Sequence, residues 1–124
     1  MSEWQRVWAW KKYWVMARSQ QHYNALRALA RGNQWSAQKA ARFEQLLLEV
    51  EKIPPTTATL TNAYQHVWGY FKRDSTEAEK QRYLDLLATL TPDSDQLGPY
   101  LKQLAGKYQV KYLLASRLMQ AMQN

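Results

Sequence analysis

The spacing of apolar residues constrains this chain more than any other feature of its sequence. Leucine, aromatic and β-branched residues recur every three or four positions along most of the 124 residues, which is the repeat of one face of an α-helix. No stretch combines apolar alternation with the turn residues of a β-hairpin. We therefore predict an all-α fold, a single compact bundle of six or seven helices forming one domain over residues 1–124.

Capping and helix-breaking residues divide this pattern into segments. Ser19, Ser36 and Thr76 each precede an apolar repeat where an N-cap is expected, and Thr76 with Glu79 has the spacing of a capping box. Gly32 suits a helix end because glycine tolerates left-handed dihedral angles. The predicted helices cover about 3–17, 20–31, 36–53, 60–72 and 76–91, followed by two short helices separated near 106–109.

Positive charge is distributed unevenly along the chain. Lys and Arg number 17 against 10 Asp and Glu, which gives a formal net charge of +7. No acidic residue occurs from Trp4 to Phe43, or from Gln96 to the last residue. Part of the surface should then carry a positive potential, which speeds encounter with polyanions. The charge favours nucleic acid as a partner, although solubility alone would also explain a basic chain.

The sequence lacks the usual constellations of an enzyme. The absence of cysteine excludes disulfides, thiolate catalysis and iron–sulfur clusters in this chain. His22 and His66 are the only histidines, and there is neither a glycine-rich phosphate loop nor a nucleophile elbow. We therefore expect no catalytic residues, no metal, no cofactor and no enzymatic activity of the domain by itself.

Two features bear on cellular location. The first residues lack the apolar core of a signal peptide, and no uncharged apolar run approaches the roughly 18 residues of a membrane span. The cationic first helix could instead lie on an anionic membrane surface. A continuous core downstream would compete for its apolar face, so we expect a cytoplasmic protein with no membrane partner.

The segment 62–73 (NAYQHVWGYFKR) is the most informative part of the sequence. On a continuous helix, four of its residues would share the face opposite the apolar stripe. They are Asn62, His66, Gly69 and Arg73. Glycine inside a helix costs roughly 0.5–1 kcal/mol relative to alanine, so Gly69 should permit a close approach to the backbone. The approaching group would be either RNA or another helix, and in the second case His66 would bond a buried carbonyl.

A second segment, 10–18 (WKKYWVMAR), alternates cations with aromatic residues. Such aromatics can stack on bases or on guanidinium groups. Tryptophans at helical spacing more often belong to a core, however, so the cations are the better candidates for binding. They are Lys11, Lys12 and Arg18.

Together with the tail, these segments resemble the YbgA-like family, a bacterial domain of unknown function found alone or fused behind a thiouracil desulfidase domain. The resemblance covers nearly the whole chain. The first motif is met by Lys12, Tyr13, Val15, Met16, Ala17, Arg18 and Tyr23. The second and more specific motif is met by Asn62, His66, Gly69, Tyr70, Phe71 and Lys72. A tail motif is met by Lys107, Tyr108, Val110, Tyr112 and Leu113.

The chain also departs from the family pattern. Members usually have histidines where this chain has Trp8, Lys11 and Arg18, and prolines where it has Gln109 and Lys111. These changes weaken any role that needs imidazole, but they retain or add positive charge, so RNA binding survives them better than acid–base catalysis. For fused members, the resemblance implies a domain that holds thiolated tRNA for the desulfidase. The cysteines that would hold the desulfidase's cluster are absent here.

The leading hypothesis is an RNA-binding accessory domain, specifically for tRNA and associated with thiouridine desulfuration. Its expected phosphate contacts are Lys11, Lys12, Arg18, Lys72, Arg73, Lys107 and Lys111. Its expected base or sugar contacts are Asn62, His66 and Tyr70.

Two other hypotheses predict different surfaces. A protein-interaction module that docks on a separately encoded desulfidase or other nucleic-acid enzyme requires an exposed apolar patch. A small enzyme or ligand-binding domain requires His66 and Tyr70 to converge on a cavity between helices.

Overall fold

The computed structural model of the chain describes residues 2–32 and 34–122. These residues form eight α-helices and no β-strand, which confirms the all-α prediction. The helices are α1 (Glu3–Met16), α2 (Gln20–Ala30), α3 (Ala37–Glu51), α4 (Thr57–Trp68), α5 (Glu77–Ala88), α6 (Leu97–Lys107), α7 (Lys111–Ala115) and α8 (Arg117–Gln120).

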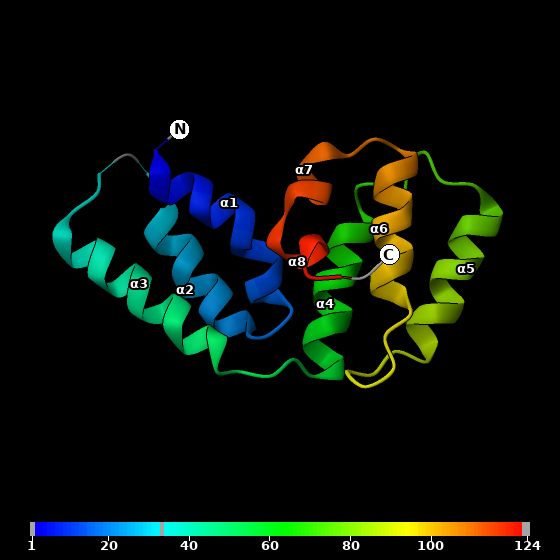
Figure 1. Cartoon of the computed structure of the whole chain (residues 1–124), viewed down its shortest axis with the longest axis horizontal. Coiled ribbons are helices and arrows are strands. Elements are labelled where there is room, and N and C mark those ends of the chain that lie inside the picture. The colour runs from blue at the N-terminus through cyan, green and yellow to red at the C-terminus, as the bar shows by residue number, and fades with distance from the viewer. Residues whose placement is uncertain (1, 33, 123–124) are drawn as a thin grey trace.

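The helices are arranged approximately in a row (Figure 1). α3, α2 and α1 form one end, α5 and α6 form the other, and α4 lies between them. α1 contacts both α4 and α8, while α7 and α8 contact α6. The two short C-terminal helices therefore join the N-terminal three helices to the second half of the chain.

A single hydrophobic cluster receives side chains from every helix. Its largest fully buried apolar members are Phe71, Met16, Leu26, Leu97, Leu101, Leu113, Met119, Val15, Val50 and Val67. Trp8 and Trp14 are also buried in it, as their helical spacing indicates. The apolar face of α1 is therefore occupied by the core. Within the described ranges, no helix is both long and apolar enough to cross a bilayer.

The predicted capping residues form the expected contacts. Ser19 and Ser36 accept backbone N–H groups at the starts of α2 and α3. Thr76 accepts the Glu79 N–H, and the Glu79 carboxylate accepts the Thr76 N–H, which completes the predicted capping box. Gly32 follows α2 with φ of +87°. Because these signals act within a few residues, they could be identified without knowledge of the tertiary fold.

The prediction for α4 was wrong at both ends. The helix starts at Thr57 rather than near residue 60, because Thr56 forms a reciprocal capping box with Thr59. It ends at Trp68 rather than near residue 72, and residues 69–74 form turns. In these turns Phe71 N–H bonds the Trp68 carbonyl, a tighter i to i−3 pattern. The predicted common face of residues 62, 66, 69 and 73 therefore does not continue beyond α4.

The tail contains one more helix than the two expected. The predicted break near 106–109 is present, and Gln109 there has a left-handed φ of 56°. A second break follows at Ser116, whose extended backbone ends α7 and whose side chain accepts the Met119 N–H to begin α8. Ser116 is buried, and a single buried serine inside an apolar repeat gives little sign in the sequence that a helix ends there.

Candidate functional site

Aromatic side chains from three distant segments meet around Lys12. We call Tyr13 of α1, Tyr70 of the turn after α4, and Tyr112 of α7 the tyrosine cluster. The Tyr13 and Tyr70 rings meet edge to face with centroids 6.1 Å apart, and the Tyr70 and Tyr112 centroids are 6.3 Å apart. Each of the three segments on which the family resemblance depends therefore contributes one ring.

Hydrogen bonds hold these rings in place. The Tyr13 and Tyr70 hydroxyls are 2.9 Å apart, and the Tyr112 hydroxyl donates to the Ala9 carbonyl at 2.6 Å. Tyr13 is only 8% exposed, whereas Tyr70 is 39% and Tyr112 37% exposed. The buried ring thus supports two that remain partly open to solvent.

Lys12 supplies the charge at the tyrosine cluster. Its Nζ lies 5.2 Å from the Tyr13 centroid and 5.6 Å from the Tyr112 centroid, within the range of cation–π attraction. Burial, and then the nearby positive charge of Arg27, lower the pKa of Lys12. In the part of the chain that the structure describes, no carboxylate forms an ion pair with either cation.

The Tyr13 and Tyr112 hydroxyls do not neutralise this charge at ordinary pH. Burial, followed by the bond to Tyr70, raises the pKa of Tyr13. Burial, followed by the proximity of Tyr70, raises the pKa of Tyr112 to about 12. Both hydroxyls therefore remain protonated, and the site keeps a net positive charge that an anion can balance.

Three further predicted cations are close in sequence to the cluster. Lys72 and Arg73 follow Tyr70 in the 69–74 turn, and Lys111 immediately precedes Tyr112; all three are exposed. Their exposure and their positions in the sequence make them candidates for the same surface as Lys12, Tyr70 and Tyr112.

Asn62 and His66 lie on α4, in the turns that precede Tyr70. Asn62 Nδ2 donates to the Gln20 side chain, which joins α4 to the start of α2. His66 is exposed, and its Nδ1 lies 2.9 Å from the Asn62 carbonyl of the same helix. A Cβ placed on Gly69 would meet the His66 carbonyl at 3.1 Å. His66 therefore bonds an exposed carbonyl, and the atom nearest to Gly69 belongs to its own helix rather than to a neighbouring one.

Lys11 of α1 and Arg18, in the turn that follows α1, belong to a different group. The Arg18 guanidinium donates to the Ile53 carbonyl at 2.8 Å and lies 4.7 Å from the centroid of the Trp14 ring. Burial, and then the charge of Arg117, lower the pKa of Lys11. Lys11 points away from Lys12 because adjacent residues on a helix lie about 100° apart. Arg18 is instead held by the Ile53 carbonyl and the Trp14 ring.

Arg117 is the centre of that second group. Its guanidinium lies 3.7 Å from the Trp14 centroid and donates two bonds to the Glu51 carboxylate, at 2.7 and 3.2 Å. The paired charges tie α8 to the end of α3, while the stacking ties α8 to α1. This arrangement is suited to holding helices together.

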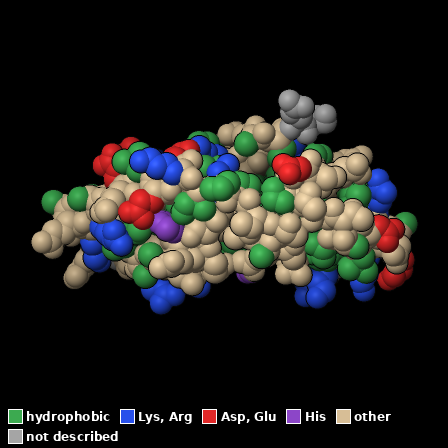
Figure 2. Space-filling view, turned by 90° about the horizontal axis from the view of Figure 1, so that it is seen from below, with side chains coloured by type: hydrophobic (Ala, Val, Ile, Leu, Met, Phe, Trp, Pro, Cys, Tyr) green, Lys and Arg blue, Asp and Glu red, His purple; other side chains and the backbone are tan. Residues whose placement is uncertain are grey.

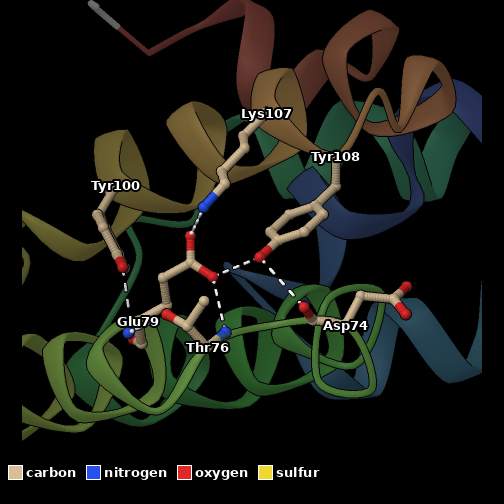
Figure 3. A network of polar contacts seen from close by, with 6 residues as sticks. All are labelled: Asp74, Thr76, Glu79, Tyr100, Lys107 and Tyr108. Atoms are coloured by element: carbon tan, nitrogen blue, oxygen red, sulfur yellow. Dashed lines mark hydrogen bonds and ion pairs between the residues drawn. The ribbon is translucent and has the colours of Figure 1, made fainter.

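Lys107 is engaged in a network centred on Glu79 (Figure 3). Lys107 Nζ lies 2.6 Å from Glu79 Oε2, and the Tyr108 hydroxyl donates to the other carboxylate oxygen. The Tyr100 hydroxyl also bonds the Glu79 backbone carbonyl at 3.4 Å. These contacts connect the start of α5 to α6 and neutralise Lys107, which the structure does not bring together with Lys12.

Replacing Glu79 with glutamine is expected to reduce the loss of stability on acidification. Bonds from Lys107, then from Tyr108 and Thr76, lower the pKa of Glu79 to about 2, whereas an unperturbed Glu has a pKa of about 4.3. The stabilisation is therefore complete above about pH 4.3 and is lost as pH falls toward 2. Urea unfolding of both proteins from pH 6 to 2 tests this. If the free energy of unfolding fell equally in both proteins as the pH was lowered, this role of Glu79 would be contradicted.

The face viewed in Figure 2 does not carry a single basic patch. Its Lys and Arg side chains lie in separate groups toward both ends of the molecule, with Asp and Glu among them. Among the residues described, no group of three potential ligands is placed to hold a metal ion.

An apolar groove lies between α1 and α3. Its walls include Trp4, Val7, Trp35, Phe43 and Leu47, and the Trp4 and Trp35 rings stack with centroids 4.2 Å apart. This groove is the kind of feature that the docking hypothesis requires.

Four residues around Lys12 or the tyrosine cluster were not among the predicted contacts: Tyr13, Tyr23, Arg27 and Tyr112. Tyr13, Tyr23 and Tyr112 occur in the motifs of the family resemblance, which was the available signal for them. For Arg27 the signal was its spacing of four from Tyr23, one helical turn. Their convergence with Tyr70 depends on the packing of α7 and could not be obtained from spacing.

Comparisons with known proteins place the chain in a family. No curated protein and no solved structure matches it. One family model matches residues 12–122, which includes the tyrosine cluster and α2 to α8. The chain belongs to the family described as "Protein of unknown function (DUF1722)".

Proposed function

We propose that this protein is a YbgA-like domain that binds RNA, specifically tRNA, as an accessory to thiouridine desulfuration. The observation that supports this most directly is Lys12 beside the tyrosine cluster, next to partly exposed rings and with no carboxylate paired to it among the described residues. Phosphates require such cations, and bases can stack on such rings.

The nearby cations extend this surface. Lys72, Arg73 and Lys111 are exposed and lie one to three residues from Tyr70 or Tyr112. Ion pairs with phosphates release counterions from RNA, so the affinity should depend strongly on salt. Lys107 is less suited to such contact because Glu79 already balances its charge.

Binding of the full chain to bulk tRNA, with duplex DNA as competitor, tests the proposal. Across a salt series from about 50 to 200 mM, we expect binding that prefers tRNA. A plot of log affinity against log salt concentration should become steeper by roughly 0.7–0.9 for each phosphate contact. Fluorescence anisotropy measures the affinity at each salt concentration.

Absence of binding, or binding without preference for tRNA, would contradict the proposal. The groove between α1 and α3 favours a second candidate in that case, a module that docks on a separately encoded desulfidase or other nucleic-acid enzyme. Co-purification of such an enzyme, lost when Trp35 is replaced with alanine, would support docking.

A further inference from the structure

We propose that the tyrosine cluster is a stacking site for one unpaired RNA base, with Lys12 and Arg27 binding an adjacent phosphate. This inference rests on the proposed function and specifies it, because it names the structural element of RNA that the surface accepts. A base that is paired within a helix has both faces covered by its neighbours. A base in a loop or bulge has a face available for an aromatic ring.

The open rings are the first support for this assignment. Tyr70 and Tyr112 are each more than one-third exposed, although they are large aromatic residues. Their rings are tilted by 32° with centroids 6.3 Å apart, so they form neighbouring walls rather than one closed stack. A base can therefore lie against their solvent-facing side without separating them.

The second support is that the rings are already fixed. Tyr13 is buried and its hydroxyl bonds that of Tyr70, while Tyr112 is bonded to the backbone of α1. Little side-chain freedom remains to be lost on binding, and such preorganisation lowers the entropic cost of association. A surface tyrosine without these partners would lose more freedom on stacking.

The third support is the charge beside the rings. Lys12 is held over two of the rings, and the charge that acts on it is that of another cation, Arg27. An anion placed here relieves the repulsion between the two cations. A nucleotide satisfies both requirements, since its phosphate is anionic and its base presents a flat face.

A base-to-abasic comparison tests the inference directly. The probes are a short RNA duplex with a single-uridine bulge, the same duplex with an abasic bulge, and the fully paired duplex. We expect the wild-type chain to bind the uridine bulge more tightly than the abasic bulge by about 5- to 150-fold. Tyr70→Leu should abolish this preference and bind the abasic bulge as the wild type does.

Two variants control for indirect effects. Tyr70→Phe loses the hydroxyl bond to Tyr13 but keeps the ring, and it should keep the preference for the base. Lys80→Ala removes a cation from the exposed side of α5, remote from α1, and should leave the preference unchanged. If Tyr70→Leu does not fold, Tyr112→Leu provides the same comparison.

The outcomes separate this inference from the proposed function. Salt-dependent tRNA binding without any preference for the uridine bulge would overturn the stacking site and leave the proposed function intact. A preference that persists in both leucine variants would also overturn it. Failure to bind any RNA would overturn both. Binding of a polyglutamate peptide instead, lost in Lys12→Ala, would assign the surface to an acidic protein.

Discussion

Replacing Phe71 with alanine is expected to destabilise the protein by about 3–5 kcal/mol, because the change leaves a cavity in a packed core. Phe71 is fully buried, and its ring packs against Trp68 and Tyr108. For a domain of this size, the melting temperature should fall by roughly 10–20 °C. Thermal unfolding followed by circular dichroism measures the effect.

An exposed apolar residue provides the matched control. Leu84 on α5 is 44% exposed, and Leu84→Ala should change the stability by no more than about 0.5 kcal/mol. Phe71→Leu should be milder than Phe71→Ala because it removes less volume. Equal stability of Phe71→Ala and Leu84→Ala would show that Phe71 does not anchor the 69–74 turn. The burial of Phe71 is relevant to the candidate site because its neighbours in the turn are Tyr70 and Lys72.

Local signals in the sequence predicted most of the fold. Serine and threonine caps determine helix starts because the side chain accepts the backbone N–H of the third following residue. The starts of α2, α3 and α5 were therefore recognisable at Ser19, Ser36 and Thr76. The capping box of α4 was missed because it uses Thr59 where glutamate or glutamine is the usual signature. Helix ends inside an apolar repeat, as at Trp68, were not visible, because both the helix and the turn bury apolar side chains.

The candidate site was less predictable because charge alone does not show which cations are already paired. Lys12 and Lys107 are equally charged in the sequence, but Glu79 neutralises Lys107 from 28 residues away. Arg18 is similarly engaged, by a carbonyl 35 residues away at Ile53. Contacts over such separations follow from helix packing, which the apolar spacing constrains only loosely.

The geometry also changes the meaning of the 62–73 motif. On one continuous helix its polar residues would form a single face, with Arg73 aligned to His66. Because α4 ends at Trp68, the chain turns, Phe71 enters the core and Tyr70 reaches the Tyr13 hydroxyl. The part of this motif that meets the other two segments is therefore the turn, which orients Tyr70 toward them.

The variant that combines Lys12→Ala, Lys72→Ala and Arg73→Ala is expected to lower tRNA affinity on the order of 100-fold at about 150 mM salt. Removing three phosphate contacts should also reduce the slope of log affinity against log salt concentration by roughly 2 to 3. All three side chains lack an ion-pair partner within the described residues, so their loss should not leave a carboxylate unpaired. Anisotropy titrations at several salt concentrations measure both quantities.

A second triple variant tests whether position matters as well as charge. Lys39→Ala, Lys52→Ala and Lys80→Ala together remove the same net charge from α3, its C-terminal end and α5. They should lower affinity far less, because long-range attraction between separated charges is screened at this salt concentration. Equal losses in the two triple variants would mean that tRNA responds only to overall charge. A selective loss in the first would assign phosphate contact to the surface around Lys12, where the rings of the tyrosine cluster can also reach a base.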